Sequence, residues 1–284
     1  MKNKFKSTFA IITFLLGFTA TAQINPTYNS LLWEISGNGL AKPSYLFGTL
    51  HMMCEKDFNI SDKTKKAFEK SQKLVLELDL DDPSELAEMQ KMVQSEMPLS
   101  KTLTPTEYQQ LDDFLKKQVG VGAASFENYN LVSILSIAII KALNCPPKMF
   151  EVEFSQMAAS KQMEILGLEN IHEQLSAFDQ SFTNAKLIEQ LQYYDASYLE
   201  QMVKVYNSEN LNDLYAMVSD TKFMDANARK VMIDSRNENW VKQMPKLMKM
   251  QNTFFAVGAA HLPGNKGLIG LLKKAGYNVK PVMD

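Results

Sequence analysis

The sequence predicts an α+β fold of α/β-like character, in which two βαβ-containing halves form a central sheet with substantial helical insertions. Two stretches lead to this prediction. Near the beginning, a strand, a helix and a second strand follow one another within about 35 residues, which is typical of a βαβ unit. Near the end, residues 253–282 repeat the same order of elements. The long region between them has mainly helical periodicity, so we expect it to form the insertions.

The first unit begins with residues 45–47 (YLF), an apolar run that predicts a short buried strand ending at Gly48. Residues 61–71 are expected to form a helix, because the segment starts with a serine and an aspartate that are suited to cap it. The next strand has the clearest signal in the chain. Residues 74–80 (LVLELDL) alternate, so that the leucines share one face and Glu77 lies on the other.

The second unit has the same design. Residues 253–257 (TFFAV) predict a strand that ends at Gly258. Residues 267–274 predict a short helix, and Gly276 is placed to end it, since glycine readily adopts the left-handed conformation found after a helix. Residues 277–282 (YNVKPV) are the returning strand.

The middle of the chain is expected to be helical around one further strand. That strand covers residues 163–167 and is followed by Glu169. The segment 104–107 (TPTE) has the spacing of a capping box with proline in the first turn, so it should start a helix. The other expected helices cover residues 83–92, 130–143, 151–161 and most of 173–250. No flexible linker interrupts this pattern, and residues 23–284 are predicted to be a single domain.

The first 22 residues have the order of regions found in secretory signal peptides. Three lysines within the first six residues precede an apolar run over residues 9–18, and residues 20–22 (ATA) form a small-residue cleavage site. The apolar run is shorter than the stretch of about 20 residues that spans a bilayer. We therefore expect cleavage after Ala22 and a periplasmic or secreted protein with no stable membrane anchor.

The charge pattern argues against nucleic acid as a partner. The chain has 30 Lys and Arg against 32 Asp and Glu, for a formal net charge of −2. Only Arg229 and Arg236 are arginines, whereas proteins that grip phosphates usually present several guanidinium groups. We expect a peptide or small-molecule substrate instead. The oligomeric state does not follow from the sequence.

The two cysteines, Cys54 and Cys145, have three alternative roles. In an oxidising compartment they can form a disulfide, and closing a loop of roughly 90 residues is worth about 4 kcal/mol in the chain-entropy account. They are also compatible with two unrelated buried thiols. Cys54 follows His51 by three residues, which makes metal ligation a third alternative.

Two of the three histidines end a Gly-x-x-His segment, one running from Gly48 to His51 and the other from Gly258 to His261. With 12 glycines and 3 histidines in 284 residues, chance predicts roughly 0.13 such segments. Each segment follows an apolar strand, so both histidines are expected at the carboxyl ends of strands, where open α/β sheets bind ligands. Glycine there permits a sharp turn and the close approach of a ligand.

Acidic residues are expected at the same edge of the sheet. Glu77 lies near the end of its strand, and Glu169 follows another. A carboxylate among aliphatic side chains is costly to bury unless it is paired or binds a metal. Two neutral imidazoles and one carboxylate are the ligands of many catalytic metal sites, which predicts a metal held by His51, His261 and Glu77. A second carboxylate is a candidate general base, and Arg236 is a candidate to stabilise an oxyanion.

Each of these residues also has a plainer interpretation. A single histidine at a strand end is more often a hydrogen-bonded structural residue than a ligand, and only the matched pair reverses that expectation. Glu77 alone is equally compatible with a solvated carboxylate on an edge strand. Residues 79–82 are expected to be a solvated acidic turn rather than a calcium loop, and His172 is expected on the surface.

Taken together, these segments resemble the TraB/GumN family, which is related to the Tiki metalloproteases. The resemblance rests on YLFGTLHM and LELD near the beginning, on residues 151–174 with the motif GLENIHEQ, on the pair Arg236-Asn237, and on FFAVGAAHLPGNKGLIGLLKKAGYNV at the end. It covers nearly all of the chain after the signal peptide, and the two ends are its specific parts.

The resemblance implies a fold of two facing βαβ-containing halves and a divalent-metal peptidase or related hydrolase, using Mn²⁺, Co²⁺ or Zn²⁺. It implies a metal site and a catalytic set made of His51, His261, Glu77, Glu169, Arg236 and Asn237. The alternative is a protein on the same scaffold that binds a metal, haem or small ligand without turnover. The sequence contains neither a serine nucleophile elbow nor a glycine-rich phosphate loop.

Overall fold

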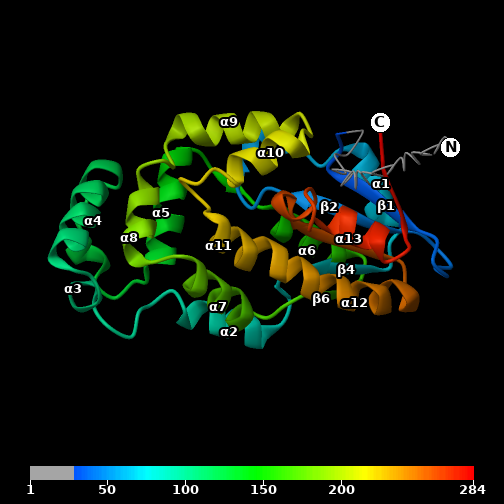
Figure 1. Cartoon of the computed structure of the whole chain (residues 1–284), viewed down its shortest axis with the longest axis horizontal. Helices are drawn as coiled ribbons and strands as arrows, with labels where there is room; N and C mark the ends of the chain where they lie inside the picture. Colours follow the sequence, from blue (N-terminus) through cyan, green and yellow to red (C-terminus); the bar gives the residue numbers. More distant parts are fainter. Residues whose placement is uncertain (1–28) are drawn as a thin grey trace, which may run out of the picture.

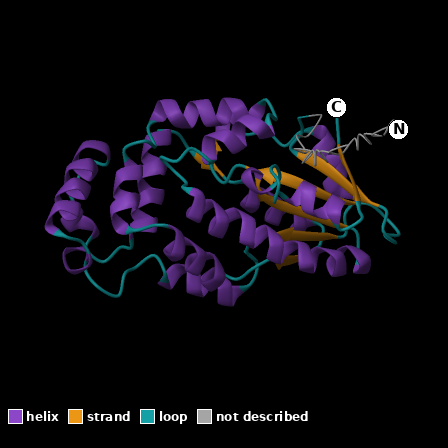
Figure 2. Ribbon diagram, in the orientation of Figure 1, coloured by secondary structure: helices purple, strands orange, loops and turns teal. Residues whose placement is uncertain are grey.

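The computed structural model describes residues 29–284, so the predicted signal peptide lies outside the described residues. Within residues 29–284, six strands form one mixed sheet in the order β6-β4-β7-β2-β1-β8 (Figure 2). The strands are β1 (Leu32–Ser36), β2 (Ser44–Thr49), β4 (Lys73–Leu76), β6 (Glu164–Gly167), β7 (Thr253–Gly258) and β8 (Asn278–Pro281). Neighbouring strands from β6 to β2 are parallel, and β1 is antiparallel to both its neighbours. The predicted fold class is confirmed.

Both predicted βαβ units are present, and they interleave in this one sheet. The first runs from β2 through α1 (Asp62–Lys70) to β4, and β7 lies between its two strands. The second runs from β7 through α13 (Leu268–Lys274) to β8, and β2 and β1 lie between its strands. Consequently β2 and β7 are neighbours in register, with Thr49 opposite Gly258. The two Gly-x-x-His segments therefore leave the sheet side by side.

Helices cover both faces of the sheet (Figure 1). On one face, Phe254 of β7 packs between Phe68 of α1 and Phe154 of α6 (Phe150–Ser160), with ring centroids 5.3 and 5.1 Å apart. On the other face lie α13 and α12 (Arg236–Met250), whose Trp240 and Met244 are fully buried. Burying each of these side chains contributes about 1.5–3 kcal/mol, so the sheet is held as a buried layer.

The predicted helical insertions form the rest of the molecule. A second hydrophobic cluster joins α3 (Leu99–Thr102), α4 (Pro105–Gln118), α5 (Leu131–Leu143) and α8 (Asn184–Leu191), at the end of the molecule away from the sheet (Figure 1). The remaining helices are α2 (Pro83–Lys91), α7 (Ile171–Ser181), α9 (Ala196–Asn207), α10 (Leu211–Val218) and α11 (Ala226–Arg229). No helix in residues 29–284 combines the length and apolarity needed to cross a bilayer.

Local signals in the sequence were reliable at the helix ends. Thr104 and Glu107 form the predicted capping box, and Gly276 has the left-handed φ of +92° expected after α13. The strand predicted over residues 74–80 is shorter, because β4 ends at Leu76. Strand β4 lies inside the sheet, is parallel to both neighbours and is buried along its whole length. Alternation of apolar and polar residues is not a guide to the ends of such a strand, and in this sequence it continues beyond Leu76. Strand β1 was not predicted.

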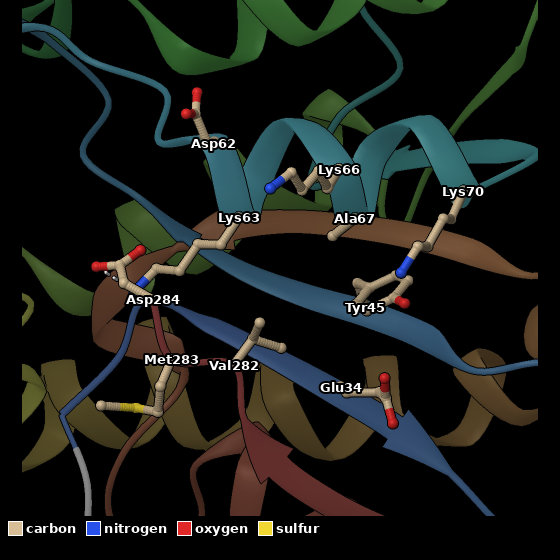
Figure 3. Close-up of a pocket in the computed structure, with 10 residues that line it drawn as sticks. All are labelled: Glu34, Tyr45, Asp62, Lys63, Lys66, Ala67, Lys70, Val282, Met283 and Asp284. Atoms are coloured by element: carbon tan, nitrogen blue, oxygen red, sulfur yellow. Dashed lines mark ion pairs between the residues drawn. The ribbon is translucent and has the colours of Figure 1, made fainter.

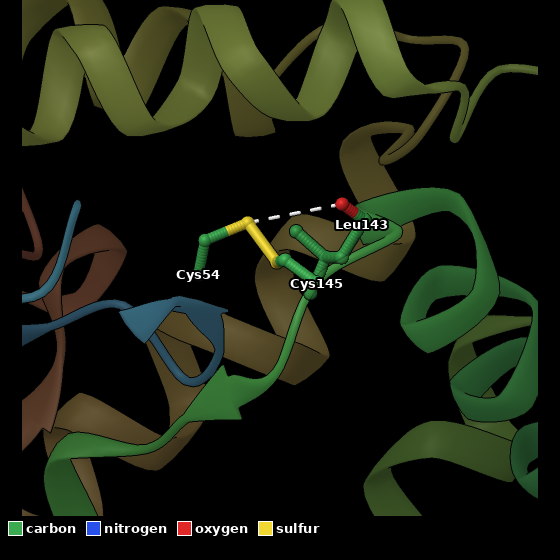
Figure 4. Close-up of a disulfide and its surroundings, with 3 residues drawn as sticks. All are labelled: Cys54, Leu143 and Cys145. Carbon is green, nitrogen blue, oxygen red and sulfur yellow. Dashed lines mark hydrogen bonds between the residues drawn. A yellow bond between two sulfur atoms is a disulfide. The ribbon is translucent and has the colours of Figure 1, made fainter. Parts of the chain in front are cut away.

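Cys54 and Cys145 form a disulfide, which decides among their three alternatives (Figure 4). It lies beside a two-stranded ribbon of β3 (Met53–Cys54) and β5 (Pro147–Lys148). The sulfur of Cys54 is therefore not available as a metal ligand.

Replacing Gly48 with alanine is expected to destabilise the protein. A Cβ at Gly48 would lie 3.0 Å from both Cα and Cβ of Ala259 and 3.2 Å from Cδ2 of Leu262. Overpacking of this kind costs about 1–3 kcal/mol, which urea denaturation measures directly. Gly270→Ala is the matched control, since its Cβ would meet no atom closer than 3.5 Å and it lies within a helix. Equal losses in the two variants would contradict the account.

Candidate metal centre

The candidate site lies at the carboxyl ends of four adjacent parallel strands. His51 follows β2, Glu77 follows β4, Glu169 follows β6, and His261 ends the short 3₁₀ turn after β7. Because β6, β4, β7 and β2 are consecutive in the sheet, these ends are neighbours. Helix α12 adds Arg236 from the face that it covers. The structure thus brings the predicted residues to one edge.

Gly258 is the point at which the three predicted ligands converge. A Cβ built on Gly258 would lie 3.3 Å from Oε1 of Glu77, 3.5 Å from Nε2 of His51 and 3.6 Å from Cδ2 of His261. The φ of Gly258 is −50°, which any residue adopts, so glycine is required here for space alone. The three side chains therefore surround one small space beside the backbone.

His261 is buried and presents Nε2 toward this space. Its Nδ1–H donates to Oδ1 of Asn237 at 2.7 Å, an assignment that follows because the Asn237 amide donates to the carbonyls of His261 and Lys266 at 3.1 and 2.9 Å. Burial lowers the pKa of His261 to about 3, against the opposing effect of Glu77. The ring is therefore neutral, with its Nε2 lone pair 3.8 Å from Oε1 of Glu77.

His51 is held in the corresponding way but at the rim, with its side chain 64% exposed. Its Nδ1 donates to Oε1 of Glu151 at 3.0 Å, and the same oxygen accepts from the Thr49 hydroxyl at 2.8 Å. Desolvation is the largest single effect and lowers the pKa of His51, but the charge and hydrogen bond of Glu151 and the charge of Glu77 together outweigh it and raise the pKa to about 9. Without a metal the ring is therefore protonated at neutral pH, and Nε2, the nitrogen not bonded to Glu151, has to release its proton before it can bind a metal.

Glu77 is an ionised carboxylate despite being buried. Its Oε1 accepts from the backbone N–H of Gly258 at 2.7 Å, and its Oε2 accepts from Arg236 at 2.6 Å and Gln174 at 3.2 Å. Burial raises the pKa of Glu77, but Arg236, the two histidines and the Gly258 N–H together outweigh it and lower the pKa to about 2. The carboxylate is therefore charged throughout the physiological range.

Arg236 connects the carboxylates, and all five of its N–H groups have acceptors. Nε donates to both oxygens of Glu169 at 3.1 Å, and Nη2 donates to Glu77 and Glu169 at 2.6 Å each. Nη1 donates to the carbonyl of Met232 at 2.9 Å and to Nε2 of His261 at 3.3 Å. The guanidinium therefore pairs with two buried carboxylates and leaves one net negative charge in the group.

Glu169 is the counter-ion of Arg236 in this arrangement. Oε1 also accepts from Gln174 at 3.0 Å, and Oε2 accepts from the indole N–H of Trp240 at 3.2 Å. The Trp240 ring lies against the ring of His261, with centroids 4.4 Å apart, and beneath the guanidinium of Arg236 at 4.8 Å. With both oxygens occupied, Glu169 has no free lone pair directed at the space beside Gly258, and its role as a general base stays a prediction.

Four residues of the site were not predicted from the sequence, namely Thr49, Glu151, Gln174 and Trp240. Trp240 follows Arg236 by four residues on a helix, a spacing that places both on one face and was available as a signal. Glu151 had no such signal, because its partner His51 is 100 residues away. His172 is 65% exposed, as predicted.

The donor set has the chemistry that a divalent metal uses. Each candidate imidazole is held through Nδ1 by an oxygen, which leaves Nε2 to bind, as in most histidine metal sites. Ligands of one tetrahedral metal lie about 3.4 Å apart, against 3.8 Å between Nε2 of His261 and Oε1 of Glu77. In the described part of the chain, no three His, Cys, Asp or Glu side chains are already closed around a metal position. Metal binding would require small movements of these side chains and the loss of the hydrogen bond from Arg236 to Nε2 of His261.

A separate cavity of about 460 Å³ lies between α1 and the sheet, beside the end of the chain (Figure 3). Its lining includes Lys63, Lys66 and Lys70 together with Glu34 and Asp284. None of the candidate site residues contributes to that lining.

Comparisons with known proteins identify the family of the chain. The TraB/PrgY/gumN family matches residues 31–281 of the chain. Metalloprotease TIKI1 of Danio rerio is 25% identical over 89% of this chain and 63% of its own length. Metalloprotease TIKI1 of Homo sapiens is 25% identical over 92% of this chain and 64% of its own length, and the TIKI homolog of Nematostella vectensis is 24% identical over 90% and 67%. The chain thus spans less than two thirds of the first of these relatives.

Gly258→Ala is expected to abolish metal binding while leaving the fold intact. The added methyl group would occupy the space between Glu77, His51 and His261 and would displace Glu77 from the Gly258 N–H. Titration with Co²⁺, followed by the visible absorption of the bound metal, measures the effect as a loss of at least about 100-fold in affinity. Circular dichroism checks the fold. Metal affinity equal to that of the unaltered protein would rule out this space as the metal position.

Proposed function

Because the chain belongs to the TraB/PrgY/gumN family, we propose that it is an exported, divalent-metal-dependent hydrolase that cleaves peptides. The observation that carries the proposal is the convergence of His51, His261 and Glu77 beside Gly258. Two features favour a metal over a purely structural cluster. Each imidazole is fixed by an oxygen on its far nitrogen, and the carboxylate between them stays ionised while buried.

In this proposal Nε2 of His51, Nε2 of His261 and Oε1 of Glu77 hold the metal, which is Mn²⁺, Co²⁺ or Zn²⁺. A metal bound by three such ligands supplies a water of lowered pKa and polarises a substrate carbonyl. Asn237 and Glu151 fix the orientation and the protonated nitrogen of the two rings. Exposure of the His51 side chain leaves this side of the site open to a substrate.

Arg236 has a second role in the proposal. All five of its N–H groups are used, and one of them donates to the Nε2 lone pair of His261. A His261 that is engaged as a ligand no longer accepts this N–H. Arg236 then has one free donor next to the reacting group, held in place by Glu77 and Glu169. Such a donor stabilises the negative charge that develops on a substrate oxygen during hydrolysis.

The substrate class and the location rest on other grounds. Peptide hydrolysis is proposed because the relatives are named metalloproteases. Export is proposed from the signal-peptide pattern of residues 1–22. The disulfide between Cys54 and Cys145 agrees with an oxidising compartment.

The proposal predicts that metal and activity depend on the paired histidines and not on the third. Purified protein is expected to contain about one equivalent of Mn²⁺, Co²⁺ or Zn²⁺, because the three ligands surround one space. His51→Ala and His261→Ala are expected to lose the metal and the hydrolysis of a peptide panel, since each removes a ligand. His172→Ala is the matched control, because His172 is exposed and outside the site. Elemental analysis and peptide cleavage measure both properties.

Two outcomes would contradict the proposal. Full peptide hydrolysis after exhaustive chelation would remove the metal from the reaction. Stoichiometric metal without hydrolysis of peptides or esters would favour the alternative function, a binding protein that holds a metal or small ligand at the same site.

A further inference from the structure

The two candidate histidines are held with very different strength. His261 is 4% exposed, its ring packs against the ring of Trp240, and Asn237 forms hydrogen bonds with both its ring and its backbone carbonyl. His51 lies in the loop between β2 and β3 with its side chain 64% exposed. Among the described residues its ring has one hydrogen-bond partner, Glu151. Of the two histidines, His51 is therefore the one whose position changes more easily.

The position of His51 depends on how two distant segments are joined. The first runs from Thr49 to Cys54 and carries His51 in its middle. The second runs from Cys145 to Glu151 and ends in the first turn of α6. Oε1 of Glu151 accepts from both Thr49 and His51, so it joins the segments at one end.

The disulfide joins the same two segments at their other end. Cys54 and Cys145 form the bond, and next to it Cys54 pairs with Pro147 and Met53 with Lys148 (Figure 4). One further backbone hydrogen bond, from Glu55 to Pro146 at 3.0 Å, continues this ribbon. A ribbon of two residues per strand is too short to be stable by itself. The packing of Phe58 on Phe150, with ring centroids 4.4 Å apart, also joins the segments here, and the disulfide is the covalent constraint on their separation.

We propose that the Cys54–Cys145 disulfide is a positioning element for the site, which holds His51 against Glu151. Opening the disulfide frees the His51 loop from the start of α6 and leaves His261, Glu77 and their partners in place. Metal affinity then falls, a consequence that rests on the proposed function. The positioning of His51 itself does not depend on a metal being bound.

The disulfide can be reached from solvent. A cavity of about 430 Å³ is lined by both cysteines, by the end of α5 and by α9 residues including Leu199 and Val203. A small dithiol such as dithiothreitol has access through it. The reaction transfers two electrons and two protons to the S–S bond, giving two protein thiols and the cyclic disulfide of the reagent.

The test compares the oxidised protein, the reduced protein and the double variant Cys54→Ala/Cys145→Ala, all freed of metal. Long-range ¹H–¹⁵N spectra of the histidine rings report the protonation and hydrogen bonding of each ring nitrogen. The oxidised protein is expected to show a His51 Nδ1–H that is held in a hydrogen bond to Glu151. Reduction and the double variant are expected to give the averaged ring signal of a free histidine for His51, with His261 unchanged. Reoxidation restores the first spectrum.

Leu111→Ala is the control for a general loss of stability. Leu111 is fully buried in the second hydrophobic cluster, away from the sheet core. This variant is expected to keep the oxidised His51 signal although it is destabilised. In the metal-binding arm, the reduced protein and the double variant are expected to bind Co²⁺ at least about 10-fold more weakly. The control is expected to bind as the unaltered protein does.

Two results would overturn the proposal. The first is an unchanged His51 ring signal in the folded, reduced protein and in the double variant. The second is an equal change in the Leu111→Ala control. Failure of the oxidised protein to bind Co²⁺ at all would contradict the proposed function instead, and the ring spectra would still decide the positioning role.

Discussion

The pairing of Arg236 with Glu77 and Glu169 is the interaction on which the rest of the site depends. The three charged groups are each less than a tenth exposed, and breaking a pair of this kind costs about 3–5 kcal/mol because one charge is left uncompensated. The pairing holds α12 against the ends of β4 and β6. Once α12 is fixed, the next residue, Asn237, reaches His261, and Trp240 one turn later covers its ring.

The same pairing sets the electrostatics of the site. Two carboxylates and one guanidinium carry one net negative charge, and His261 is neutral beside them. A buried negative charge next to Nε2 of two imidazoles favours a divalent cation, which displaces the Nε2 proton of His51 when it binds. Arg236 also keeps Glu77 ionised, with its pKa lowered to about 2, so the carboxylate does not have to lose a proton before it binds. The paired charges thus prepare the donor set for a metal.

Much of this site was predictable because its parts are local in the sequence. A strand followed by glycine and then histidine places that histidine at a sheet edge, and this reasoning located His51 and His261 correctly. The interleaving of β7 between β2 and β4 was not predictable, because strand order is decided by packing between segments that lie some 200 residues apart. Glu151 was missed for the same reason, since a hydrogen bond across 100 residues leaves no periodic signal.

The central claim is that a metal binds in the space between His51, His261 and Glu77, and anomalous diffraction tests it most directly. Crystals grown with Co²⁺ or Zn²⁺ are measured on both sides of the absorption edge of the metal. We expect one strong peak beside Gly258, within about 2.0–2.2 Å of Nε2 of both histidines and an oxygen of Glu77. A peak bonded to other groups, or no peak there while Arg236 still donates to His261, would contradict it.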